Sequence, residues 1–282
     1  MRSRQVLRLH AAHRDDIGDL VTRRPLPGPG LAHLDPFLFL NHHGPQVYPA
    51  GNRGLPFGPH PHRGFETVTF ILEGQLSHRD SGGHESVIRA GGVQWMTAGS
   101  GLVHAELSPE SFKRSGGPLE ILQLWINLPA RLKMTKPAYV GLEAGDVPSV
   151  AFEGGTLALV SERWDSIEGP ISPLADIRLM LVRLRAGGAI DIPVAAGRTI
   201  FLYSVTGKAE VGGTLVPEHH LAELGADGDG VSIRSATETL ILFGHGAPFG
   251  EPIVSHGPFV MNSREEIVEA VQDYQAGRFG GL

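Results

Sequence analysis

The sequence predicts an all-β protein with two tandem jelly-roll barrels and a short C-terminal helix. Glycine and proline are frequent, at 38 and 21 of 282 residues, which is typical of short strands joined by tight turns. Segments rich in β-branched and aromatic residues recur along the chain at the spacing of strand–turn units. Sustained charged helical repeats are absent from the sequence. These observations together favour barrels or double-sheet jelly rolls.

The first barrel is predicted over residues 1–135. Its strand signals become regular beyond residue 60, and the turns Glu73-Gly74-Gln75 and Ser81-Gly82-Gly83 separate the first of them. Pro129 ends the last strand, because proline cannot donate to a sheet. The expected strands are 36–40, 67–72, 76–80, 86–89, 93–96 and 121–128.

The second barrel is predicted over residues 136–282. The turn Thr206-Gly207-Lys208 parallels Glu73-Gly74-Gln75, which indicates a weak internal duplication. The expected strands are 157–160, 179–182, 199–203, 209–211 and 239–243.

A helix is expected after Ser263, because Ser263-Arg264-Glu265-Glu266 has the form of a capping box. Gly277 is a plausible end for it. Its apolar face repeats at helical spacing through Ile267, Ala270, Val271 and Tyr274.

The amino-acid composition excludes some classes of function and makes others unexpected. Lys and Arg number 24 against 30 Asp and Glu, a net charge of −6, so the chain is not expected to bind nucleic acid. With no cysteine, disulfides and thiolate metal sites are excluded, and any metal must be held by nitrogen and oxygen. The N-terminus lacks the apolar stretch of a signal peptide, and no apolar run reaches membrane-spanning length. We therefore expect a cytoplasmic protein that does not bind membranes.

Two short motifs carry donor side chains at i, i+2: His60-Pro61-His62 and His104-Ala105-Glu106. Residues two apart on a strand point to the same face, so each motif can direct two donors at one point. A single His-x-His is more often an ordinary surface or core pair. Two such pairs in a cysteine-free chain favour a divalent transition metal held by three imidazoles and a carboxylate.

Glu66 competes with Glu106 for the carboxylate position. If the alternation continues from His62 along one strand, Gly64, Glu66, Val68 and Phe70 share the ligand face. Glu66 could then bind the ion, orient a histidine or accept backbone hydrogen bonds. Because Glu106 forms a same-face pair with His104, it is the favoured ligand.

Residues 58–69 and 94–106, which contain these motifs, closely resemble the pirin family of the cupin superfamily, as do residues 124–129 and 257–263. The resemblance implies a bicupin fold with one metal in the N-terminal barrel. The family's ligand positions match His60, His62, His104 and Glu106. It also implies that the metal is most often Fe(II), with Mn, Co, Ni, Cu or Zn as alternatives.

The second barrel is expected to lack a metal. Where the fold would place a second His-x-His, the chain has Ala189-Ile190-Asp191-Ile192-Pro193, and no ligand set is apparent between residues 160 and 260. We therefore predict a structural role for this barrel.

The resemblance implies two functions, and the sequence leaves both open. One is a dioxygenase that cleaves flavonols such as quercetin with O2, in which Glu106 is the general base and the strands of Val68, Phe70 and Trp95 line an apolar cavity. The other is a non-enzymatic, iron- and redox-responsive regulator that binds transcription factors or metabolic enzymes. A sealed cavity beside the metal would favour the second.

Overall fold

The structure is a computed structural model that describes residues 1–282. The chain forms two compact units, each assembled from three separate stretches of sequence. The first barrel comprises Arg14–Arg23, Phe37–Asp146 and Phe249–Leu282. The second barrel comprises Met1–His13, Arg24–Pro36 and Val147–Pro248.

These units differ from the continuous ranges 1–135 and 136–282 at both ends of the chain. Strand β1 (Val6–Ala11) pairs antiparallel with β22 (His220–Leu224) and so joins the second barrel. The C-terminal stretch belongs instead to the first barrel. Local sequence patterns indicate that a segment is a strand or helix, but not which sheet it joins.

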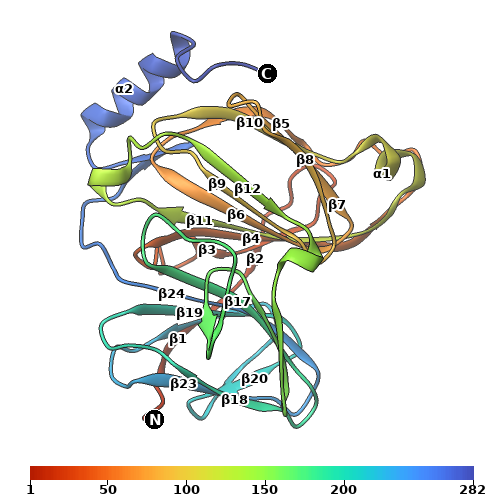
Figure 1. Cartoon of the computed structure of the whole chain (residues 1–282), viewed down its shortest axis with the longest axis vertical. Coiled ribbons are helices and arrows are strands. Elements are labelled where there is room, and N and C mark those ends of the chain that lie inside the picture. Colours follow the sequence, from red (N-terminus) through yellow and green to blue (C-terminus); the bar gives the residue numbers. More distant parts are fainter. The chain divides into compact units, whose positions relative to one another are not determined.

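The first barrel consists of two main sheets (Figure 1), with the strand orders β12-β9-β6-β11-β4-β3-β2 and β5-β10-β7-β8. Both sheets contribute to a buried core that contains Ile71, Leu76, Ile88 and Ile121. The strands are β2 (His13–Arg14), β3 (Thr22–Leu26), β4 (Phe37–Tyr48), β5 (Phe57–His62), β6 (Phe65–Glu73), β7 (Gln75–Asp80), β8 (Glu85–Arg89), β9 (Val93–Thr97), β10 (Leu102–Leu107), β11 (Gly117–Asn127) and β12 (Ala138–Leu142).

The second barrel has a seven-stranded sheet, β1-β22-β19-β24-β17-β14-β13, and a four-stranded sheet, β18-β23-β20-β21, with a small β15-β16 hairpin. Its core is aliphatic and includes Leu157, Val182, Leu202 and Ile241. The strands are β13 (Ser149–Phe152), β14 (Gly155–Leu159), β15 (Arg163–Trp164), β16 (Ile167–Glu168), β17 (Ile177–Leu184), β18 (Ala189–Pro193), β19 (Thr199–Thr206), β20 (Ala209–Val211), β21 (Thr214–Val216), β23 (Gly230–Arg234) and β24 (Thr239–Gly246).

The two barrels repeat the same local design, as the paired turns predict. In the large sheets β6-β11-β4 corresponds to β19-β24-β17. The turns between β6 and β7 and between β19 and β20 place Gly74 and Gly207 at φ of 84° and 72°. A Cβ at Gly74 would lie 2.7 Å from the Pro118 carbonyl oxygen, and one at Gly207 2.4 Å from that of Glu238. Both turns therefore require glycine for the same steric reason.

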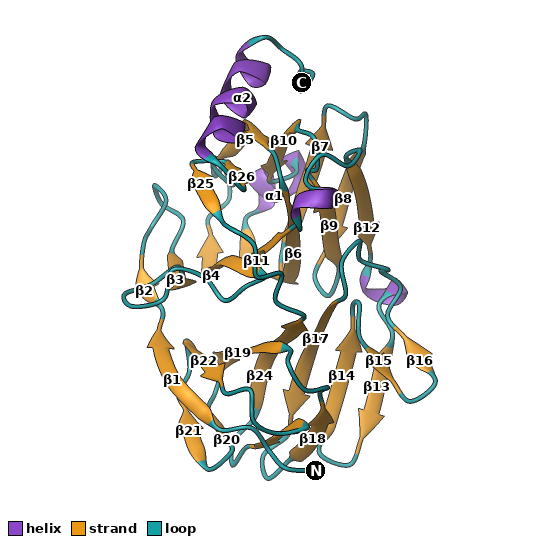
Figure 2. Ribbon diagram, turned by 90° about the vertical axis from the view of Figure 1, so that its left-hand side faces the viewer, coloured by secondary structure: helices purple, strands orange, loops and turns teal.

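The C-terminal helix α2 (Arg264–Gln275) has the predicted capping box: the Glu266 N–H donates to Ser263 Oγ, and Glu266 Oε2 accepts from the Ser263 N–H. Ala276 is the C-cap and Gly277 follows at a φ of 73°. Figure 2 shows α2 beside the hairpin of β25 (Val254–His256) and β26 (Phe259–Met261).

The other helices were not predicted and are short: α1 (Glu110–Ser115) and the 3-10 turns Ala130–Leu132 and Ala144–Asp146. None of the helices combines the length and apolarity needed to span a membrane.

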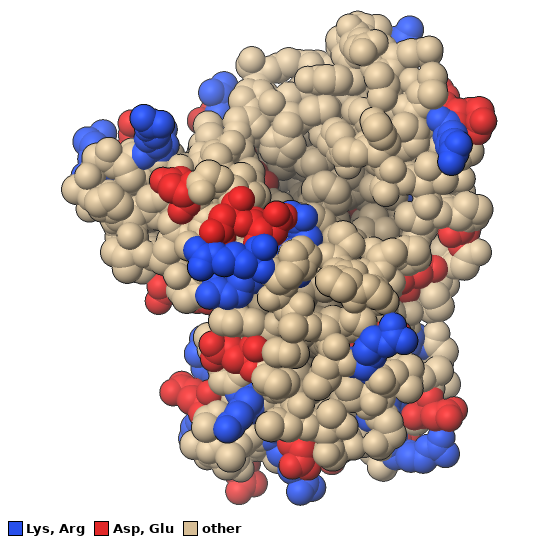
Figure 3. Space-filling view, turned by 180° about the vertical axis from the view of Figure 1, so that it is seen from behind, with Lys and Arg blue, Asp and Glu red and all other residues tan.

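Charged side chains of both signs lie near one another on the face drawn in Figure 3. This mixed distribution accompanies the modest net charge of −6. A surface specialised for nucleic acid would instead concentrate positive charge. The expectation that the chain does not bind nucleic acid stays a prediction.

Candidate metal centre

Three histidines converge in the first barrel. His60 and His62 lie at the end of β5, and His104 lies on the neighbouring strand β10. The antiparallel register pairs His104 with His60. One ring nitrogen from each of the three lies within 4.8 Å of the others. The predicted convergence of the three imidazoles is therefore present.

The His-x-His motif ends its strand, whereas the alternation argument requires that it begin one. β5 is the edge strand of the four-stranded sheet, which suits Pro59 and Pro61 because neither has an N–H to donate. The chain then passes through Gly64, at a φ of 89°, and enters β6 in the other sheet. The predicted continuous alternation from His62 to Phe70 is therefore wrong.

Hydrogen bonds orient two of the rings. His60 Nδ1 lies 2.7 Å from the Gly58 carbonyl oxygen, and His62 Nδ1 lies 3.3 Å from that of Pro258. A carbonyl can only accept, so each Nδ1 must carry the hydrogen and each Nε2 keeps its lone pair. Metal-binding histidines are commonly held in this way.

His104 provides the strongest test of whether the residues fit a metal. Its side chain is 1% exposed, and neither ring nitrogen has a hydrogen-bond partner. Leaving a buried polar group without a partner is costly, so native structures rarely do so. A metal ion bound by His104 together with His60 and His62 would satisfy one of these nitrogens.

The electrostatics also favour neutral, ligating imidazoles. Burial, with a smaller contribution from the neighbouring His60, lowers the pKa of His62 to about 3. Burial also holds the pKa of His104 well below its usual value, with the other histidines contributing. Both rings are therefore unprotonated at neutral pH, as metal coordination requires. His60 is partly exposed, so the cluster is not sealed from solvent.

Glu106 lies on β10 near the cluster but is not part of the group of three. The Thr69 hydroxyl donates to its Oε1 at 3.1 Å, and Gln123 Nε2 donates to its Oε2 at 2.6 Å. A carboxylate has about four acceptor positions, so two stay open for a proton or an ion. The assignment of Glu106 as fourth ligand and base stays a prediction.

Glu66 also lies outside the cluster. The Thr97 hydroxyl donates to its Oε1 at 2.6 Å, whereas its buried Oε2 has no hydrogen-bond partner. Burial raises the pKa of Glu66, and the side chains of Thr97 and Trp95 oppose this only in part. Glu66 is thus a carboxyl group for which the fold favours the protonated form.

We expect Glu66→Gln to flatten the pH dependence of stability in the metal-free protein. Because the folded-state pKa of Glu66 is raised, its ionisation destabilises the fold progressively as pH rises above the unfolded value, about 4.3. The neutral amide cannot ionise. Urea unfolding between pH 5 and 8 should show that wild type loses more stability than the variant, and parallel curves would contradict this.

Aromatic rings that sequence reasoning missed flank the cluster. The ring centroid of His62 lies 5.2 Å from that of Trp125 and 5.0 Å from that of Phe65. Phe39 stacks on Trp125 at 4.6 Å. The sequence indicated part of this aromatic surface, because Gln123 and Trp125 are two apart on β11 and therefore point to the same face of the strand. Gln123 contacts Glu106 and Trp125 contacts His62.

A second buried polar group adjoins His104. The ring of His78 lies 5.5 Å from that of His104 and stacks on Tyr139 at 4.1 Å. His78 and His84 each lie 3.0 Å from Asp80 Oδ2. Burial alone would raise the pKa of Asp80, but these contacts outweigh it and lower the pKa to about 2. His78 and His84 thus have carboxylate partners, in keeping with non-ligating roles.

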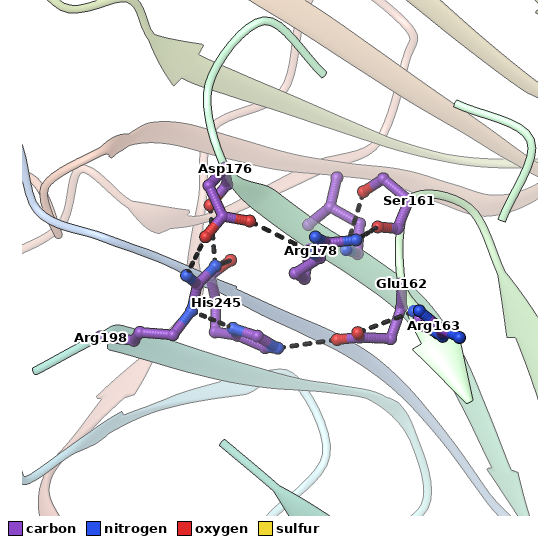
Figure 4. A network of polar contacts seen from close by, with 8 residues as sticks. Ser161, Glu162, Arg163, Asp176, Arg178, Arg198 and His245 are labelled. Atoms are coloured by element: carbon purple, nitrogen blue, oxygen red, sulfur yellow. Dashed lines mark hydrogen bonds and ion pairs between the residues drawn. The ribbon is translucent and has the colours of Figure 1, made fainter. Parts of the chain in front are cut away.

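The second barrel has no comparable cluster of ligands. Ile190 and Ile192 of β18 are buried in its aliphatic core, and Asp191 between them is exposed. Among its buried imidazoles, His245 has a partner at both ring nitrogens (Figure 4): Nε2 lies 2.7 Å from Glu162, and Arg198 Nε donates to Nδ1 at 2.6 Å. The structural role of this barrel stays a prediction.

The fold and the site together define a class: a bicupin, with a histidine cluster in one jelly-roll barrel and an aliphatic second barrel. The family model for pirin matches residues 11–126, and the model for the pirin C-terminal cupin domain matches residues 179–280. The chain belongs to the pirin family.

Similar proteins cover nearly the whole chain. A pirin-like protein of Caulobacter vibrioides is 40% identical over 268 residues, which are 94% of each chain. A Pseudomonas aeruginosa protein with the provisional name quercetin 2,3-dioxygenase is 39% identical over 249 residues, 88% of this chain and 87% of that one. The crystal structure of quercetin 2,3-dioxygenase from Acinetobacter baumannii superposes with a TM-score of 0.92 at 33% identity, covering 99% of both chains.

Proposed function

We propose that this protein is a metal-dependent dioxygenase that opens the heterocyclic ring of flavonols such as quercetin. The main observation behind the proposal is the cluster of His60, His62 and His104. Glu106, whose carboxylate accepts two side-chain hydrogen bonds, lies on the same strand as His104. The Acinetobacter baumannii quercetin 2,3-dioxygenase, similar over 99% of the chain, supports the choice of substrate.

The three histidines, with Glu106 as fourth ligand, would hold one divalent transition ion, for which Fe(II) is our first choice. A bound ion of this kind would acidify a coordinated flavonol hydroxyl and assist the reaction with O2. His60 is partly exposed, so the cluster meets solvent on the side from which substrate and O2 would have to approach.

The chain's own residues would then move one proton and shield the reacting ring. Glu106 accepts the proton of the flavonol 3-hydroxyl, while Thr69 and Gln123 hold its carboxylate in place. Both atoms of O2 enter the organic substrate, one ring carbon leaves as carbon monoxide, and the proton on Glu106 returns to the product. Trp125, which lies beside His62 and is partly exposed, offers an apolar surface for the aromatic substrate.

The test is turnover by protein loaded separately with Fe(II), Mn, Co, Ni, Cu or Zn and mixed with quercetin in air. We expect at least one form to bleach the flavonol absorption band and to release carbon monoxide. Glu106→Ala should lower that rate about 100-fold or more. As a control, Glu143→Gln removes an exposed carboxylate that pairs with Arg89 and should leave the rate unchanged.

If no metal form consumes quercetin faster than Glu106→Ala, the dioxygenase proposal fails for this substrate. A protein that still binds metal under those conditions would match the non-enzymatic, redox-responsive alternative. Elemental analysis of protein purified without added metal identifies the resident ion and separates the two questions.

A further inference from the structure

The C-terminal stretch Phe249–Leu282 supplies a hydrogen-bond partner to a candidate metal ligand. The turn between β25 and β26 places the Pro258 carbonyl oxygen 3.3 Å from His62 Nδ1. The adjoining backbone is fixed as well, because Arg63 forms a parallel bridge with Phe259 and accepts a hydrogen bond from the Val260 N–H at 3.1 Å. The orientation of the His62 ring therefore depends on a distant part of the sequence.

A buried ion pair fastens this stretch to the end of β5. Arg63 Nη2 lies 2.7 Å from Asp273 Oδ2 in helix α2, and the two side chains are 4% and 11% exposed. Arg63 Nε also donates to the Ser100 carbonyl at 2.7 Å, and its guanidinium carbon lies 4.7 Å from the centroid of the Phe279 ring. Charge-assisted bonds from a planar guanidinium fix direction as well as distance.

The same stretch also contacts β10, which carries His104. Ser81 Oγ donates to the Phe279 carbonyl at 2.6 Å and accepts from the Val103 N–H at 3.1 Å. The Val103 side chain packs in one cluster with Phe259, Met261, Ile267, Ala270 and Phe279. Both strands that carry the histidines are thus tied to a single C-terminal element.

We propose that this element positions the metal ligands, and that the Arg63–Asp273 ion pair is the contact through which it sets the direction of the His62 imidazole. The inference rests on the proposed metal site. The Pro258 carbonyl selects the form of His62 with hydrogen on Nδ1, which leaves Nε2 free to bind the ion. Asp273 is a positioning residue, because it acts through Arg63 and the hairpin.

The test is Co(II) affinity, measured by competition with a chelator. We expect Asp273→Asn to weaken Co(II) binding about 10-fold or more and to alter the visible absorption spectrum of the bound cobalt. Asp273→Glu keeps the charge and should restore part of the affinity. Glu269→Gln removes an exposed carboxylate from the same helix and should change neither the affinity nor the spectrum.

Unchanged Co(II) affinity and spectrum in Asp273→Asn, even with a lower melting temperature, would overturn the proposal, since the ion pair would then be merely structural. A second measurement needs no variant that might misfold. NMR of the metal-free wild type should show the His62 hydrogen on Nδ1, and a hydrogen on Nε2 instead would overturn the proposal.

The outcome is independent of the dioxygenase proposal, because cobalt binding requires no flavonol. An Asp273-dependent affinity without quercetin turnover would contradict only the proposed reaction. Turnover with an Asp273-independent affinity would contradict only the positioning role.

Discussion

Replacing His104 with leucine should abolish metal binding while leaving the metal-free protein at least as stable as the wild type. The imidazole is buried and neither of its nitrogens is hydrogen-bonded, so an apolar side chain of similar size removes an uncompensated polar group. Such a change is neutral or stabilising by about 1 kcal/mol. Loss of a ligand should weaken metal binding by more than about 100-fold. Replacing a residue that only hydrogen-bonds to a ligand usually has a smaller effect.

Equilibrium dialysis with Co(II) and urea unfolding of the metal-free protein measure the two effects. His42→Leu is the matched control, because His42 is equally buried but lies 2.8 Å from Glu120. It should cost about 2 kcal/mol, since the Glu120 carboxylate loses a partner, and should retain metal. A full complement of metal in His104→Leu would show that His104 is not a ligand.

Gly64→Ala should destabilise the first barrel by about 4 kcal/mol, through backbone strain and a steric clash. Gly64 has a φ of 89°, and an added Cβ would lie 2.0 Å from the Val260 carbonyl oxygen. To relieve the overlap, β26 would have to move away from β5. The metal affinity should fall with the stability, because β26 follows directly after Pro258, the hydrogen-bond partner of His62.

Gly83→Ala separates the two causes. Gly83 has almost the same φ, 90°, but nothing lies within 4 Å of its added Cβ. This variant should lose only about 1 kcal/mol, which is the strain of the backbone conformation. Denaturant midpoints of the two variants and the wild type decide the question. Equal losses would mean that the contact with Val260 contributes nothing.

The sequence was sufficient for features that depend on neighbouring residues. The strands around Val68, Ile121 and Ile241 follow from β-branched and apolar runs between turns. His60 and His62 could be placed on one face because alternation is a property of a single strand. The capping box of α2 was likewise visible in four consecutive residues.

Features that depend on long-range pairing could not be predicted. The change of sheet at Gly64 requires a positive φ, which strand alternation does not reveal. The donors to Glu106, Thr69 and Gln123, are brought together by the register of β6 against β11. The partners of His62 and Arg63 lie in the C-terminal stretch, whose apolar pattern indicated only a helix packed on some sheet.

The membership of that stretch in the first barrel has a consequence for biosynthesis. Pro258 and Asp273 are translated long after His104. A ribosome-bound chain would therefore carry all three histidines before the residues that contact His62 and Arg63 have been made. Domains generally fold as units during synthesis, but His62 lacks its Pro258 partner and Arg63 its Asp273 partner until the C-terminal stretch has been made. We therefore expect the histidines to bind the ion tightly only after the C-terminal stretch has been made and has packed against them.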